Sequence, residues 1–126
     1  MKLSTLLTIA SVYMALAGLG FILFPQAFGR GAVPPDASPA LIAYLRLTGS
    51  PMLGIAVLNW IARKEGPSTA RNAIIAGNIV GFALIATLDI WGLFSDARPV
   101  TKVFVVIHLL FALAFILSGR KNFIKT

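Results

Sequence analysis

Apolar residues are gathered into four long blocks along the chain, and most charged residues and prolines fall between these blocks. The blocks cover about residues 3–24, 41–62, 73–94 and 100–117. Because a helix needs about 20 residues to cross the roughly 30 Å of hydrocarbon in a bilayer, all four blocks can span it, the last one only just. The pattern predicts an all-α polytopic membrane protein, an antiparallel four-transmembrane-helix bundle that forms a single domain over residues 1–126.

Turn and capping residues mark where the second and third helices begin. Ser38 followed by Pro39 is typical of an N-cap and a first helical position. Ser68, directly after a Gly-Pro turn, predicts a cap for the third helix. The connection 25–40 contains four prolines and cannot be one continuous helix, whereas the connection 95–99 is short enough to make the third and fourth helices antiparallel neighbours.

Basic residues outnumber acidic residues by 11 to 4, and they concentrate at the helix ends. In a four-span topology, seven fall on the side of the termini and three on the opposite side, which predicts cytoplasmic termini in the inner (plasma) membrane. Basic residues at helix ends set the orientation of a membrane protein and contact anionic lipid headgroups, so we expect no nucleic-acid partner. The seven are Lys2, Arg63, Lys64, Arg71, Arg120, Lys121 and Lys125, and the three are Arg30, Arg98 and Lys102.

Three ionisable residues, Arg46, Asp89 and His108, fall inside the predicted spans. A charged side chain inside the membrane is costly, so such residues usually face the interior of the bundle and pair with another polar group. The topology places all three about one and a half turns below the outer end of their helices. We therefore predict an Arg46–Asp89 ion pair with His108 in hydrogen-bonding range. The alternatives are that the pair only locks two helices together, that Arg46 extends to lipid phosphates, or that this layer is a ligand, quinone or proton site.

Three neighbouring residues, Tyr44, Ser50 and Trp91, complete the predicted ligand-binding set. Pro51 removes a backbone donor from the second helix, so a bend at this point would open a pocket beside Arg46. Trp91 also suits an aromatic belt at the membrane interface.

Small residues spaced four apart occur on two of the spans: Ser50 and Gly54 on the second, Gly77 and Gly81 on the third. Such pairs are typical of helices whose backbones approach closely in a membrane. We expect both pairs to serve helix packing.

Several chemistries are excluded by the residues that the chain lacks. It has no cysteine, which rules out thiol catalysis and thiolate ligation of zinc or iron–sulfur clusters, and its single histidine rules out bis-histidine haem ligation within one chain. We predict neither a metal site nor catalytic residues. The first span has no acidic residue, which disfavours the four-helix multidrug antiporters that need a carboxylate there.

The stretch from Tyr44 to Trp60, Tyr-Leu-Arg-Leu-Thr-Gly-Ser-Pro-Met-Leu-Gly-Ile-Ala-Val-Leu-Asn-Trp, follows a helix that ends in Gly-Phe-Ile-Leu-Phe-Pro25. In layout, and in an arginine followed by spaced glycines, the chain resembles the DoxX-like group of small four-helix membrane proteins from bacteria and archaea. Arg46 stands where that pattern has its arginine. One branch of the group is associated with quinone-linked sulfur oxidation, so the resemblance implies a quinone as one candidate ligand.

These observations favour a non-enzymatic membrane module, either an accessory subunit or a binder of a lipid-like ligand. A quinone-interacting subunit of a redox enzyme and a small transporter in which Asp89 titrates are the alternatives. The cofactor is left open between a quinone and a bound lipid. The expected partners are membrane lipids, and association into a homo-oligomer or a larger membrane complex is left open.

Overall fold

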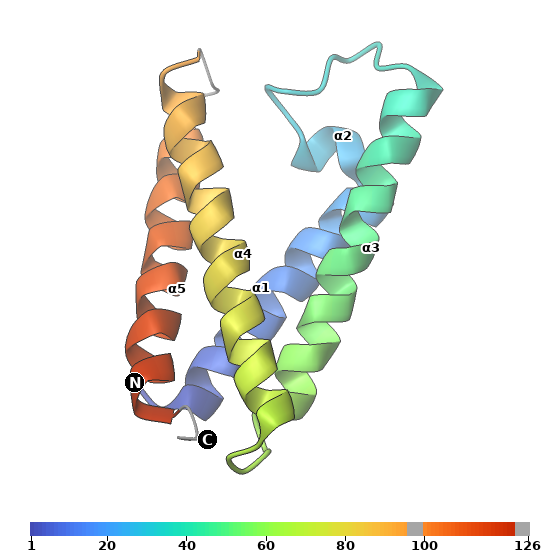
Figure 1. Cartoon of the computed structure of the whole chain (residues 1–126). Coiled ribbons are helices and arrows are strands. Elements are labelled where there is room, and N and C mark those ends of the chain that lie inside the picture. The colour runs from blue at the N-terminus through green and yellow to red at the C-terminus, as the bar shows by residue number, and fades with distance from the viewer. Residues whose placement is uncertain (96–99, 123–126) are drawn as a thin grey trace. The chain divides into compact units, whose positions relative to one another are not determined.

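The protein is all-α, as the sequence predicts. The computed structural model describes residues 1–95 and 100–122. Within these ranges it contains no strand, and four of its helices are long and apolar enough to cross a membrane. The helices are α1 (Leu3–Leu23), the short α2 (Pro25–Phe28), α3 (Pro39–Ala62), α4 (Thr69–Leu93) and α5 (Thr101–Asn122) (Figure 1).

Both predicted N-caps are confirmed. The hydroxyl oxygen of Ser38 accepts a hydrogen bond from the backbone N–H of Leu41 at 3.2 Å, and that of Ser68 accepts from the N–H of Arg71 at 3.2 Å. Each bond satisfies one of the N–H groups that the first turn of a helix leaves without a partner. The Ser68 cap explains why α4 begins at Thr69, four residues before the apolar block.

Two larger differences from the sequence prediction concern the connection after α1 and the end of the last helix. The connection after α1 contains the short helix α2, which starts directly at Pro25 because a proline at the first helical position lacks only an N–H that has no helical partner anyway. The last helix continues to Asn122, beyond the predicted end at residue 117. The hydropathy pattern shows only which residues can lie in the hydrocarbon of a bilayer. The backbone hydrogen bonds of the helix continue into the polar residues that follow, which include Arg120 and Lys121.

Backbone contacts divide the chain into two compact units. The α1–α3 unit comprises residues 7–61, and the α4–α5 unit comprises residues 1–6 and 62–126. Each unit is described by itself below.

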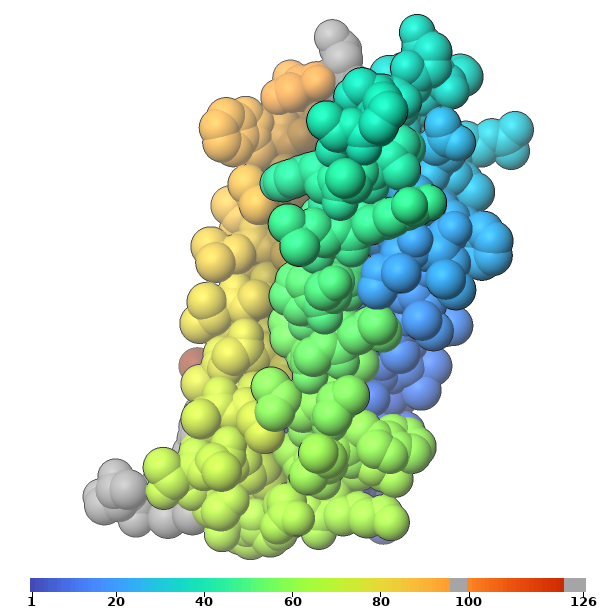
Figure 2. Space-filling model, turned by 90° about the vertical axis from the view of Figure 1, so that its right-hand side faces the viewer, coloured from blue at the N-terminus to red at the C-terminus, as the bar shows by residue number. Residues whose placement is uncertain are grey.

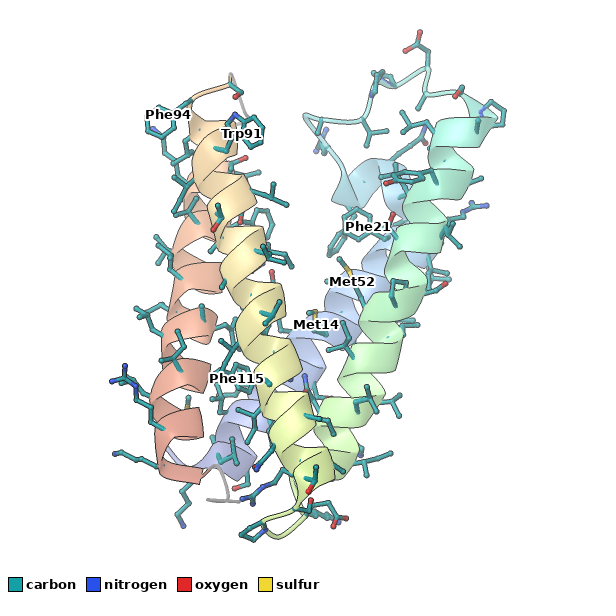
Figure 3. All side chains as sticks on the ribbon, in the orientation of Figure 1. Met14, Phe21, Met52, Trp91, Phe94 and Phe115 are labelled. Carbon is teal, nitrogen blue, oxygen red and sulfur yellow. The ribbon has the colours of Figure 1, made fainter. Side chains whose placement is uncertain are left out.

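In the α1–α3 unit, the two long helices meet along a seam of small residues. The hydroxyl of Ser11 donates to the carbonyl oxygen of Ala56 at 2.7 Å. Seven residues further on along α1, a Cβ atom placed on Gly18 would lie 2.9 Å from the carbonyl oxygen of Gly49, and one on Gly49 would lie 2.5 Å from that of Gly18. Since Gly49 precedes Ala56 by the same seven residues, the helices are antiparallel with a heptad repeat, the geometry of a left-handed helix pair. Figure 3 labels Met14 on α1 and Met52 on α3, which lie between these two contacts.

Within their own units, the other small residues make no close approach, so their predicted role in helix packing stays a prediction. A Cβ atom placed on Gly54, Gly77 or Gly81 would meet no described atom within 4 Å, and Ser50 is exposed. The close approach between α1 and α3 is made at Gly49, one residue before the predicted pair of Ser50 and Gly54. The seam follows a seven-residue spacing and not a four-residue one.

In the α4–α5 unit, aromatic rings fill the space between the two helices. Phe82 on α4 stacks on Phe111 of α5 with ring centroids 4.5 Å apart, and it lies 5.9 Å from the ring of Phe115, which Figure 3 labels. Phe82 and Phe115 are fully buried. The predicted pairing of the third and fourth spans as neighbours is confirmed, although residues 96–99 of their connection lie outside the described ranges.

Large apolar side chains also cover the outside of the helices. Figure 2 turns α3 toward the viewer, in green, with its side chains at the surface. Exposed apolar surface on this scale suits lipid rather than water. The chain is therefore a small multi-pass membrane protein. The exposed large residues of α3 are Leu41, Tyr44, Leu47, Ile55, Val57, Leu58, Trp60 and Ile61.

Candidate functional site

An acidic and an imidazole side chain meet between α4 and α5. Nδ1 of His108 lies 2.6 Å from Oδ2 of Asp89, and the two side chains are 9% and 22% exposed. Asp89 is four residues before the end of α4, and His108 is seven residues after the start of α5, so both lie roughly 6–10 Å inside the span. The predicted hydrogen bond between His108 and the polar layer is confirmed, with Asp89 as its partner.

Aromatic rings enclose this pair on the histidine side. Phe104 stacks on the imidazole with centroids 5.9 Å apart and an angle of 16°, and Phe82 lies 6.1 Å away at 35°. The Asp89–His108 contact is also one heptad from the Phe82–Phe115 contact on both helices, so it belongs to the same antiparallel seam. In such apolar surroundings, loss of either partner would leave the other without compensation for its desolvation.

The pair can hold a hydrogen-bonded proton, since an imidazole N–H donates and a carboxylate oxygen accepts. It is too small a donor set for a metal centre. Within residues 1–95 and 100–122, no three His, Cys, Asp or Glu side chains come together in a way that could hold an ion.

A second candidate site lies in the α1–α3 unit, where Arg46 faces the end of α1. An open pocket of about 300 Å³ is present there. α1 ends at Leu23 and the chain turns at once into α2, while Ile42 and Arg46, four residues apart, fall on one face of α3. The pocket is lined by Leu23, Phe24, Pro25, Gln26, Ala27, Ile42 and Arg46.

α2, which supplies three of the lining residues, packs against α1. The rings of Phe21 and Phe28 meet edge to face with centroids 5.4 Å apart. A Cβ atom on Gly20 would collide with the Phe28 ring, so the glycine makes room for it. On the other side, the side-chain amide of Gln26 donates to the carbonyl oxygen of Pro35 at 3.3 Å, which ties α2 to the loop before α3.

The predicted ligand-binding residues are thus distributed over different places. Tyr44 and Ser50 are exposed on α3 and lie outside the lining of the Arg46 pocket, and Trp91 is exposed near the end of α4 (Figure 3). Arg46 and Asp89 belong to different units, so their ion pair stays a prediction.

The pocket beside Arg46 differs in origin from the one expected. α3 continues through Pro51, and the lining combines the end of α1 and α2 with Ile42 and Arg46 of α3, without any of the residues 49–51. Sequence reasoning missed Gln26 and the other α2 residues. The available signal was the Phe24-Pro25 step, which marks a helix restart as well as a helix end.

Comparison with protein-family models, with curated proteins and with solved structures finds no match to this chain. The resemblance to the DoxX-like group therefore stays a prediction.

Proposed function

We propose that this protein is a non-enzymatic membrane module that binds a lipid-like amphiphile, with the polar head of the ligand at Arg46 and its apolar part along the pocket wall. The observation that carries the proposal is one guanidinium lining a pocket whose other side chains, apart from Gln26, are apolar. Ligand sites in proteins commonly combine apolar walls with a few polar groups that orient the ligand.

Charge balance within the α1–α3 unit supports a ligand with acceptor oxygens. All of residues 7–61 are described, and Asp36 is their one acidic side chain. Arg46 forms no ion pair with Asp36. A guanidinium has five N–H donors and no acceptor. Oxygen atoms of a bound ligand head would therefore accept hydrogen bonds from Arg46 N–H groups that have no acidic partner in the α1–α3 unit.

The size of the pocket supports binding of the head and the first carbons of an amphiphile. A volume of about 300 Å³ is at the lower end of the range for small-molecule sites. Leu23 and Phe24 are exposed at its edge, so the remainder of an acyl or isoprenoid chain can continue along the lipid-facing surface.

A small transporter is the second candidate, and the Asp89–His108 pair favours it. Two groups that share a proton inside a transmembrane hairpin form the minimal element of a proton-coupled step. A quinone would use the Arg46 pocket instead, with its carbonyl oxygens as acceptors.

The test is a measurement of the amphiphiles that copurify with the protein in a mild detergent, quantified by mass spectrometry after extraction. Wild-type protein should retain about one amphiphile per chain, and Arg46→Met should lower retention about tenfold, the effect of losing one or two charge-assisted hydrogen bonds. Lys102→Met, which removes an exposed cation of the other unit, is the matched control and should retain the wild-type amount. A wild-type protein that retains no amphiphile would contradict the proposal.

A further inference from the structure

We infer that the ligand of the Arg46 pocket is an anionic phospholipid whose phosphate is bound by the guanidinium. This inference rests on the proposed function and names the ligand class. It uses three features of the α1–α3 unit: the charge of the pocket lining, its depth, and the shape of its donor.

The lining carries one positive charge and no negative one. Its single charged side chain is Arg46, and the remaining six residues are apolar apart from Gln26. A zwitterionic head would bring an ammonium group that finds no carboxylate in this lining, whereas an anionic head with a neutral substituent brings no such cost. Charge complementarity therefore selects a head with net negative charge.

The depth of the pocket matches the phosphate region of a bilayer. Residues 23–27 of the lining are the end of α1 and the start of α2, so the pocket lies where the first span ends. Arg46 is seven residues into α3, roughly 10 Å from the first residue of that helix, and a long arginine side chain can reach the level of the helix end from there.

The donor is suited to phosphate by its shape. A guanidinium presents a planar fork that binds two phosphate oxygens at once, which a lysine ammonium cannot do. The exposed side chains of Leu23 and Phe24 leave the edge of the pocket open to acyl chains.

The experiment is native mass spectrometry of the full chain in a phosphorus-free detergent, with two added lipids of identical acyl chains, phosphatidylglycerol and phosphatidylcholine. We expect phosphatidylglycerol to bind one per chain and about tenfold more tightly than phosphatidylcholine. Arg46→Met should abolish this preference, and Arg46→Lys should keep part of it because the charge remains and the fork is lost. Ile42→Trp keeps the charge but fills the pocket, so it should weaken phosphatidylglycerol binding by a similar factor. Lys102→Met should bind as wild type does.

Several results would overturn the inference, and they separate its failure from that of the proposed function. Equal binding of the two lipids would mean that the pocket binds amphiphiles but does not select an anionic head. Wild-type binding by Ile42→Trp would place the lipid outside the pocket. Displacement of phosphatidylglycerol by millimolar inorganic phosphate, with loss of phosphate binding in Arg46→Met, would make the pocket a site for a free anion. If neither lipid binds but another amphiphile copurifies, the proposed function survives alone, and if nothing binds, both fail.

Discussion

Nδ1 of His108 on α5 lies 2.6 Å from Oδ2 of Asp89 on α4, one heptad from the contact between the buried rings of Phe82 and Phe115. The polar contact and the aromatic contact therefore belong to one antiparallel seam. Because the pair is mostly enclosed, its two side chains should depend on each other for stability.

This dependence predicts a non-additive double-mutant cycle. Asp89→Leu and His108→Leu should each lower the free energy of unfolding by roughly 3–5 kcal/mol, since each leaves a buried polar partner, and the double variant should cost less than the sum. Equilibrium unfolding in detergent followed by circular dichroism measures the three values. A control cycle of Asp89 with the exposed Lys102 should be additive, and additivity of the Asp89–His108 cycle itself would show that the contact contributes no coupling.

The second prediction concerns the seam of the α1–α3 unit. Gly49→Ala should destabilise the protein by about 1–3 kcal/mol, because its Cβ would lie 2.5 Å from a backbone oxygen of α1 that cannot move without shifting the helix. Gly54→Ala, five residues along the same helix, would meet no described atom and should be neutral or stabilise by up to about 1 kcal/mol, because alanine has the higher helix propensity. Thermal unfolding midpoints of the two variants decide the matter. Equal midpoints would mean that the two helices do not meet at Gly49.

The third prediction is the orientation of the chain. Four spans place both termini on one side, and the basic residues on that side predict that it is the cytoplasm. Two of the basic residues counted for this bias lie outside the described residues, Lys125 on the side of the termini and Arg98 on the opposite side. A C-terminal fusion to a reporter that is active only in the cytoplasm should be active, and one that needs export should be silent. The reverse result would invert the topology.

Features that depend on one helix alone could be predicted from the sequence. The four spans follow from the apolar blocks, and the Ser38 and Ser68 caps follow from local hydrogen bonding that needs no other part of the fold. The pairing of His108 with Asp89 was accessible for a related reason, because a common depth on neighbouring antiparallel helices brings two side chains together.

The relationships between helices were harder to predict. The four-residue spacing of small residues on the second span indicated Ser50 and Gly54, whereas the observed seam uses Ser11 and Gly18 on α1 and Gly49 on α3. A seven-residue spacing of small residues was present in the sequence but indicates a seam only when the facing helix is known. A pocket beside Arg46 was predicted, but its lining was missed for the same reason, since the lining depends on how α2 folds back at Pro25.

The central claim is that a phosphate group occupies the Arg46 pocket, and the most direct measurement is the dipolar coupling between arginine side-chain nitrogen and phosphorus. Protein labelled with ¹⁵N-arginine, loaded with one phosphatidylglycerol per chain in a phosphorus-free detergent, would be examined by solid-state NMR. We predict dephasing of one guanidinium signal by ³¹P, at a distance of about 4 Å or less, and loss of that signal in Arg46→Met. Dephasing that persists in Arg46→Met, or no dephasing in the wild type, would contradict the account.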